Sequence, residues 1–267
     1  MKIGIFDSGL GGLTILKQIV HTLPQYDYIY LGDNARVPYG GRSSEIIYEF
    51  TRQAVEFLFT QNCQLVILAC NSATANALRR LQQEYLPRHY SQHRILGIIK
   101  PTIEYLVENN ISKVGIIGTY ATVESGAYQR EIYKVLPQAQ VNQWSCPLLV
   151  PLIEENESDS PAATLILKEY LRPLKTTKPQ TLLLACTHYG LIKERIKKLA
   201  SKKIAVIDQG LLVALKLKQY LQQHPEIDHK LSRQKKRIYY VTDLNPRFKK
   251  IAKMFISGSL AITKVSL

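Results

Sequence analysis

Two cysteines in this chain each come directly after an apolar run and directly before a helix-like pattern. Cys70 lies in QLVILACNSATANAL and Cys186 lies in TLLLACTHYGLIKERI, and a small polar residue follows each cysteine. Such apolar runs are typical of buried strands, and in open α/β sheets ligands bind beyond the carboxyl ends of the strands. The N–H groups and dipole of a following helix favour the thiolate form of a cysteine. We therefore predict that the two thiols face each other across one substrate.

Polar residues crowd the ends of these two runs and of a third run, KIGIF, at the amino terminus. They supply hydroxyl, amide, imidazole and carboxylate groups: Asp7, Ser8, Asn71, Ser72, Thr187 and His188. Together with backbone donors they outline a receptor for a carboxylate ligand. His188 is placed to exchange a proton with Cys186, and Asp7 to do so with Cys70. A structural role is the alternative for a single histidine, but a neighbouring catalytic thiol favours function.

The loop after the first run, SGLGG at residues 8–12, has two interpretations. It resembles a dinucleotide-binding turn, and Asp33 lies about where the ribose-binding acid of such a site would lie. The full G-x-G-x-x-G pattern requires glycine at position 14, where this chain has Thr14. A loop of this kind cradles a carboxylate equally well.

A second loop, GDNARVPYGGR at residues 32–42, is dense in turn residues and follows a predicted strand. It is either a surface turn or part of a binding site, because binding residues concentrate in loops at the carboxyl edge of a sheet. In the second case the Tyr39 hydroxyl and the Gly40 N–H would contact an anion. Composition alone does not decide between the two.

Short apolar runs alternate with longer amphipathic stretches along the chain. The strand-like runs are 2–6, 28–31, 65–69, 95–99, 114–117, 181–185, 204–207 and 238–241, and the helix-like stretches include 43–60, 102–109, 124–136, 162–171 and 211–222. This alternation predicts an α/β fold with parallel sheets and helices on both faces.

The sequence also repeats itself at the scale of a domain. KIGIFDSGLGG near the amino terminus has a counterpart in KVGIIGTYATVESG, which begins at Lys113, and the two cysteine segments follow at similar intervals. We predict two similar flavodoxin-like domains, 1–96 plus 208–267 and 97–207, related by a pseudo-twofold axis with the active site in the cleft between them. The two crossings, at 97–101 and 207–210, would be hinges.

The four cysteines among 267 residues show neither a C-x-x-C pair nor a zinc-ligand spacing. A reducing compartment keeps such cysteines as thiols, and Cys63 and Cys146 fit small buried apolar residues. No apolar run approaches the roughly 18 residues of a membrane span, and no signal-peptide pattern precedes the first strand. We therefore expect a cytoplasmic protein with no metal site and no membrane partner.

The formal charge of +14 raises the question of an acidic partner. Basic residues cluster at 193–203, 230–237 and 247–253, and the first and last clusters resemble solvated helix faces. Nucleic acid is disfavoured as the main partner because no recognised binding motif accompanies the charge. A positive field that attracts an anionic substrate is the simpler interpretation.

Six segments in register resemble the glutamate racemases of the cofactor-independent aspartate/glutamate racemase family. In chain order they are FDSGLGGLT, DNARVPYG, ACNSATANAL, GTYATVESGAY, CPLLVPLIEENE and ACTHYGL, which together span nearly the whole chain. The resemblance implies a bacterial enzyme that interconverts L- and D-glutamate without a cofactor and supplies D-glutamate for peptidoglycan. A homodimer is compatible with it. The alternatives are an aspartate racemase of the same family, or a basic-surfaced binding protein with subordinate catalysis.

The resemblance also implies a role for each matching residue. Cys70 and Cys186 are the two bases, because inversion through a planar carbanion needs a proton-transfer group on each face. Asp7, His188 and Glu154 match auxiliary acid–base residues. The substrate-holding positions are Ser8, Tyr39, Gly40, Asn71, Ser72, Thr122 and Thr187.

This chain departs from the family pattern at four positions. Ser72 stands in place of threonine, Lys100 of glutamate, Ala185 of glycine and Gly190 of proline. None of these changes removes a catalytic group. The charge reversal at Lys100, however, lies in a predicted hinge.

Overall fold

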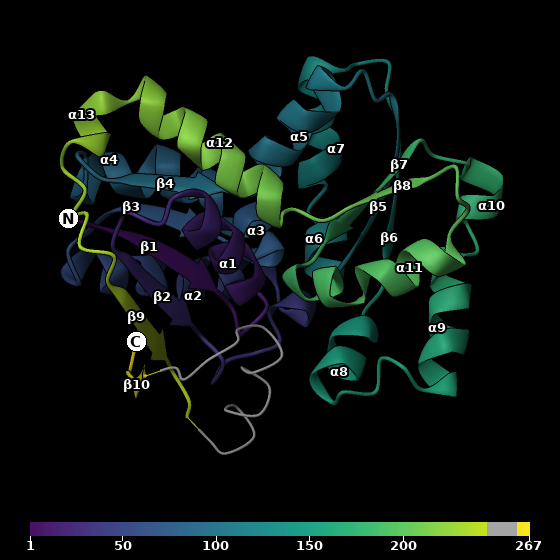
Figure 1. Cartoon of the computed structure of the whole chain (residues 1–267), viewed down its shortest axis with the longest axis horizontal. Helices are drawn as coiled ribbons and strands as arrows, with labels where there is room; N and C mark the ends of the chain where they lie inside the picture. Colours follow the sequence, from purple (N-terminus) through teal and green to yellow (C-terminus); the bar gives the residue numbers. More distant parts are fainter. Residues whose placement is uncertain (245–260) are drawn as a thin grey trace.

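The computed structural model describes residues 1–244 and 261–267, which form two parallel sheets with helices packed on both faces of each (Figure 1). This arrangement confirms the predicted α/β class. The basic cluster at 247–253 lies outside the described residues. Within the described ranges, no helix is long and apolar enough to cross a membrane.

The first sheet contains six parallel strands in the order β10-β9-β2-β1-β3-β4. Their bounds are β1 Lys2–Asp7, β2 Tyr28–Gly32, β3 Cys63–Leu68, β4 Arg94–Gly97, β9 Arg237–Val241 and β10 Ile262–Lys264. Helices α1 (Leu13–Thr22) and α12 (Gly210–Gln223) cover one face, and α2 (Ser44–Thr60) and α3 (Asn71–Arg80) cover the other. Burial on both faces explains why β1, β2 and β3 are almost entirely apolar.

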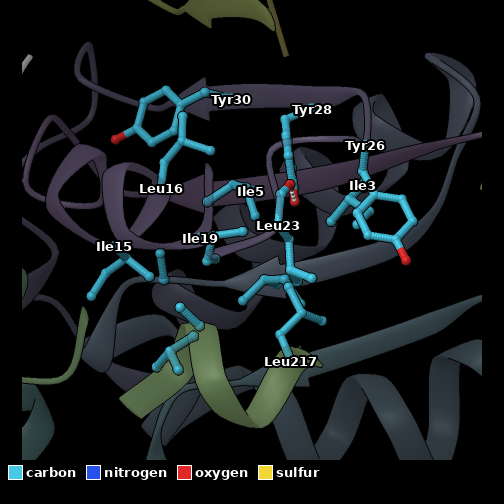
Figure 2. Packing of buried hydrophobic residues seen from close by; sticks show 14 of the residues in the cluster. Ile3, Ile5, Ile15, Leu16, Ile19, Leu23, Tyr26, Tyr28, Tyr30 and Leu217 are labelled. Carbon is cyan, nitrogen blue, oxygen red and sulfur yellow. Dashed lines mark hydrogen bonds between the residues drawn. The ribbon is translucent and has the colours of Figure 1, made fainter. Parts of the chain in front are cut away.

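The packing of α1 and α12 on the first sheet can be followed in Figure 2. Ile5 of β1 lies beside Leu16 and Ile19 of α1, and Leu217 approaches the same cluster from α12. These side chains are almost completely buried, so each contributes on the order of 1.5–3 kcal/mol of transfer free energy relative to exposure. This core fixes the carboxyl end of β1, where Asp7 and Ser8 lie.

The second sheet contains four parallel strands in the order β6-β5-β7-β8. Their bounds are β5 Lys113–Gly118, β6 Gln140–Ser145, β7 Thr181–Ala185 and β8 Ala205–Ile207. Helices α5 (Ile99–Glu108) and α7 (Ala127–Val135) pack on one face, and α8 (Leu149–Glu154), α9 (Pro161–Leu171) and α11 (Lys193–Leu199) pack on the other. The remaining short helices are η1 Tyr39–Gly41, η2 Leu81–Tyr85, α4 Leu86–His89, α6 Tyr120–Glu124, α10 Leu174–Thr177, η3 Thr187–Ile192 and α13 Pro225–Asp228.

The two sheets share one strand order. Four neighbouring strands of the first sheet have the spatial order β2-β1-β3-β4, and those of the second sheet have the order β6-β5-β7-β8. In both sets the strand that comes second in the sequence lies on one side of the first strand, and the third and fourth strands lie on its other side. Cys70 follows β3 and Cys186 follows β7, which are equivalent strands. The repeat seen in the sequence therefore corresponds to a repeated topology, and β9 returns the chain to the first sheet. The domain limits at 96 and 208 stay a prediction.

Three predicted elements differ in the structure. The strand expected at 95–99 ends at Gly97, because α5 begins at Ile99 instead of at the predicted 102. The helix expected at 124–136 begins only at Ala127, as α7, because Glu124 ends α6 and Gly126, with a φ of 62°, separates the two helices. Left-handed backbone at a glycine ends one helix and redirects the chain into the next.

Candidate active site

Cys70 lies where β3 turns into α3, with its side chain buried. Its thiol donates a hydrogen bond to Ser8 Oγ at 3.4 Å. Burial raises the pKa of Cys70 to about 12, and the charges of Asp7 and Cys186 act in the same direction. Cys70 is therefore a protonated thiol at neutral pH in the site without substrate. The contribution of Cys186 means that the two sulfurs lie within range of each other's charge.

Cys186 lies at the equivalent position after β7, and its environment is different. Its sulfur is 4.0 Å from His188 Nδ1, and His188 Nε2 is 2.9 Å from Glu154 Oε1 at the end of α8. Burial would lower the pKa of His188, but the Cys186 sulfur and the Glu154 carboxylate outweigh it and raise that pKa to about 10. A protonated imidazole beside a sulfur stabilises a thiolate. The two cysteines thus have unlike partners.

Asp7 joins the two halves of the site. It is fully buried at the end of β1, where its Oδ2 accepts from Gly9 N at 3.0 Å and its Oδ1 accepts from Thr187 Oγ1 at 3.5 Å. Burial raises the pKa of Asp7, whereas the positive charge of His188 and the backbone donors of Gly12 and Gly9 oppose that rise. Contact with Thr187 places a first-sheet carboxylate beside the Cys186 loop.

Hydroxyl groups also meet across the two halves. Ser72 Oγ on α3 lies 2.9 Å from Thr119 Oγ1 and 3.3 Å from Thr122 Oγ1 on α6. Thr119 caps α6 by accepting from Thr122 N at 3.3 Å. A methyl group at Gly40 would lie 2.7 Å from Thr119 Cβ, so the 32–42 loop packs against the same hydroxyls. Thr119 is not among the residues predicted from the sequence, although it directly follows the strand β5.

The predicted use of the Tyr39 hydroxyl as an anion donor stays a prediction, and in this structure the hydroxyl has a protein partner. Tyr39 is buried, and its hydroxyl donates its single proton to Asp33 Oδ2 at 2.5 Å. Asp33 also pairs with Arg36 at 2.6 Å and accepts from Thr242 Oγ1 at 2.9 Å. Asp33 therefore organises the 32–42 loop instead of holding a ribose.

The glycine loop at 8–12 is filled by protein groups. A methyl group at Gly11 would lie 2.2 Å from Thr187 Oγ1 and 2.6 Å from His188 Nδ1, and one at Gly12 would lie 2.5 Å from Asp7 Cβ. The glycines thus allow the backbone to approach the Cys186 loop closely. This use of the loop argues against the dinucleotide interpretation.

The four departures from the family pattern lie in ordinary surroundings. Ser72 keeps its hydroxyl contacts, and Ala185 is buried at the end of β7 in register with Gly118. Lys100 is largely exposed on α5 and lies 3.9 Å from Glu104. A Cβ atom added at Gly190 would meet Asp208 first, at 3.9 Å, so this position has room for a side chain.

The geometry agrees with the comparisons with known proteins. A family model described as Asp/Glu/Hydantoin racemase matches residues 3–216, which is most of the chain. Two parallel sheets, each with a cysteine after an equivalent strand, together with this match define the class of protein. The chain belongs to the Asp/Glu/Hydantoin racemase family and is an amino-acid racemase.

Its similar relatives are glutamate racemases from bacteria. The enzyme of Streptococcus agalactiae serotype Ia is 36% identical, over 99% of this chain and 98% of the relative, and that of Geobacter metallireducens is 37% identical, over 99% and 96%. The crystal structure of the Francisella tularensis glutamate racemase in complex with D-glutamate superimposes with a TM-score of 0.88 at 34% identity, covering 99% of this chain and 97% of that one. An aspartate racemase from Picrophilus torridus has a TM-score of 0.57 at 19% identity and shares the fold.

Proposed function

We propose that the protein interconverts L- and D-glutamate with Cys70 and Cys186 as the two bases. The observation that carries the proposal is the pair of buried thiols at equivalent strand ends, each with its own polar partner. Glutamate is favoured over aspartate because the full-length relatives are glutamate racemases, whereas the aspartate racemase shares only the fold. The product would supply D-glutamate for peptidoglycan in the cytoplasm, where four free cysteines stay reduced.

The proposed reaction is a proton transfer on each face of Cα. The thiolate on one side takes the Cα proton, and the electron pair of the broken C–H bond moves into the adjacent carboxylate. The thiol on the other side then delivers its proton to Cα, so the configuration inverts and the two cysteines exchange protonation states. Backbone and hydroxyl donors around Ser72 and Thr187 would stabilise the developing negative charge.

The two thiols have unlike partners. Burial holds Cys70 as a thiol, whereas Cys186 has the imidazole of His188 4.0 Å from its sulfur. In one direction of the reaction Cys186 would take the Cα proton and the Cys70 thiol would deliver its own from the opposite face, and in the other direction the two cysteines would exchange these roles.

Circular dichroism and deuterium exchange test the proposal together. L-glutamate incubated with the protein in heavy water should lose its dichroic signal while deuterium enters Cα, and aspartate should not. Cys70→Ser and Cys186→Ser should each lower racemisation at least roughly a thousandfold, because a serine hydroxyl is a poor base at neutral pH. Each variant should still exchange the Cα proton of one enantiomer without inverting it. Undiminished racemisation in either variant would contradict the two-base mechanism, and turnover of aspartate instead of glutamate would change the substrate.

A further inference from the structure

Three buried polar side chains form a closed hydrogen-bond ring beside the proposed bases. Asn71 is the first residue of α3 and follows Cys70, Tyr128 lies on α7, and Gln209 lies directly before α12 in the second crossing between the sheets. Their exposed fractions are 2%, 1% and 4%. The ring therefore joins both halves of the molecule at one crossing.

Each bond of the ring has a defined direction. The Tyr128 hydroxyl donates to Asn71 Oδ1 at 2.7 Å, Gln209 Nε2 donates to the Tyr128 oxygen at 2.6 Å, and Asn71 Nδ2 donates to Gln209 Oε1 at 2.7 Å. An amide oxygen only accepts and an amide nitrogen only donates. The Ile98 carbonyl oxygen, which only accepts, fixes the Gln209 amide with its nitrogen toward α5. The Asn71 amide must then present its nitrogen to Gln209 Oε1, because flipping it would place two amide oxygens opposite each other.

Gln209 also ties the ring to the first crossing. Its Nε2 lies 2.9 Å from Thr102 Oγ1 and 3.2 Å from the Ile98 carbonyl oxygen, at the start of α5. Thr102 itself donates to the same carbonyl at 3.0 Å. Both crossings are thus connected through one glutamine side chain.

The ring leaves Asn71 with an unused donor. An asparagine amide has two N–H groups, and among residues 1–244 and 261–267 only Gln209 takes one of them. Asn71 is fixed next to Cys70, while the charge of Cys186 reaches Tyr128 and adds to the effect of burial in raising the pKa of that hydroxyl. The ring therefore lies near both thiols, where an oriented N–H can bind a carboxylate.

We propose that Gln209 and Tyr128 are positioning residues that orient the Asn71 amide so that its second N–H binds the substrate. The proposal rests on the proposed racemase function. Neither residue touches the reacting atoms. Their loss should weaken substrate binding in both directions of the reaction, because Asn71 would then sample orientations that present its oxygen to a carboxylate.

Kinetic variants separate positioning from simple stability. Tyr128→Phe and Gln209→Met should each raise KM for both enantiomers about tenfold, with a smaller change in kcat. The double variant should have a KM close to that of either single variant, because one ring is already broken. Thr51→Val is the matched control, since it removes a buried hydroxyl that bonds to the Ile47 carbonyl oxygen on α2, outside the ring, and it should leave KM unchanged.

Gln209→Glu provides a readout that a structural role would not change. A protonated carboxyl accepts from Asn71 and donates to Tyr128, so it completes the ring, whereas a carboxylate cannot donate. The KM of this variant should be close to that of the unaltered protein at low pH and should rise as the new carboxyl ionises, in a range raised by burial. The titratable groups near the ring are Cys70, Tyr128, Cys186 and Asp208, which precedes Gln209 in the chain. The pH profile of the unaltered protein serves as the reference for their effects.

The outcomes distinguish the two proposals. If the unaltered protein neither binds D-glutamate nor racemises it, the proposed function fails and the role of the ring fails with it. If it does both, while Tyr128→Phe and Gln209→Met keep its KM and lower only Tm, the positioning role alone is wrong. A flat pH dependence of KM in Gln209→Glu, relative to the unaltered protein, would also overturn that role.

Discussion

At the scale of residues, the two cysteines are equivalent in topology and different in chemistry. Cys70 has Ser8 as its hydrogen-bond partner and the Asp7 carboxylate nearby, and burial keeps it protonated. Cys186 has an imidazole that Glu154 holds at 2.9 Å. Burial thus biases one side toward the thiol, while the other side has an imidazole beside its sulfur. A two-base racemase needs one proton donor and one proton acceptor at once, and unlike partners distinguish the two cysteines.

The pair of His188 and Glu154 leads to a prediction about stability and pH. The folded pKa of His188 is about 10, above its usual value of 6.5. A raised pKa stabilises the folded state fully below 6.5, and this contribution is lost as the pH rises through about 10. Glu154→Gln should therefore lower the free energy of unfolding most near pH 6.5, and its effect should shrink toward pH 10.

Denaturant unfolding at several pH values measures this difference. Glu131→Gln is a suitable control, because it removes a largely exposed ion pair with Lys134 that involves no histidine. Its effect should be small and nearly independent of pH. An effect of Glu154→Gln that does not diminish with rising pH would show that the imidazole is neutral in the folded protein.

At the scale of elements, catalytic geometry depends on loops that approach each other without side chains between them. The 8–12 loop passes so close to Thr187 and His188 that a methyl group at Gly11 has no room. Gly11→Ala should displace those two side chains and lower kcat/KM by roughly a hundredfold, the scale expected for a misplacement of about 1 Å. Gly41→Ala is the matched control, because a methyl group there meets nothing within 4 Å. Steady-state kinetics of the two variants test this prediction. Equal kcat/KM values for Gly11→Ala and Gly41→Ala would show that the close approach at Gly11 is not needed for catalysis.

The same elements explain how far sequence reasoning could go. Buried strands such as β1, β3 and β7 are continuous apolar runs, so they could be predicted, and so could the polar residues at their carboxyl ends. Strand β6 was missed because its sequence, QVNQWS, is largely polar on a sheet edge. The split between α6 and α7 depends on one left-handed glycine, which an amphipathic pattern does not reveal.

At the scale of the whole molecule, the duplicated strand order places one thiol in each half, and this could be predicted from the repeated Ala-Cys segments. The ring of Asn71, Tyr128 and Gln209 could not, because its members lie far apart in sequence and meet only through packing between the halves. Thr119 was missed for a similar reason, since its importance depends on contact with Ser72 across the site.

The net charge of +14 supports a last prediction about nucleic acid. Some side chains of the basic clusters at 193–203 and 230–237 form ion pairs within the protein: Arg195 pairs with Asp159, and Arg233 pairs with Asp228. Charge dispersed in this way gives weak, non-specific binding that falls steeply with salt. We expect retention on a DNA column at low salt and none at about 0.15 M, with racemisation unaffected by added DNA. Retention at that salt concentration, or inhibition of racemisation by DNA, would instead favour the basic-surfaced binding protein.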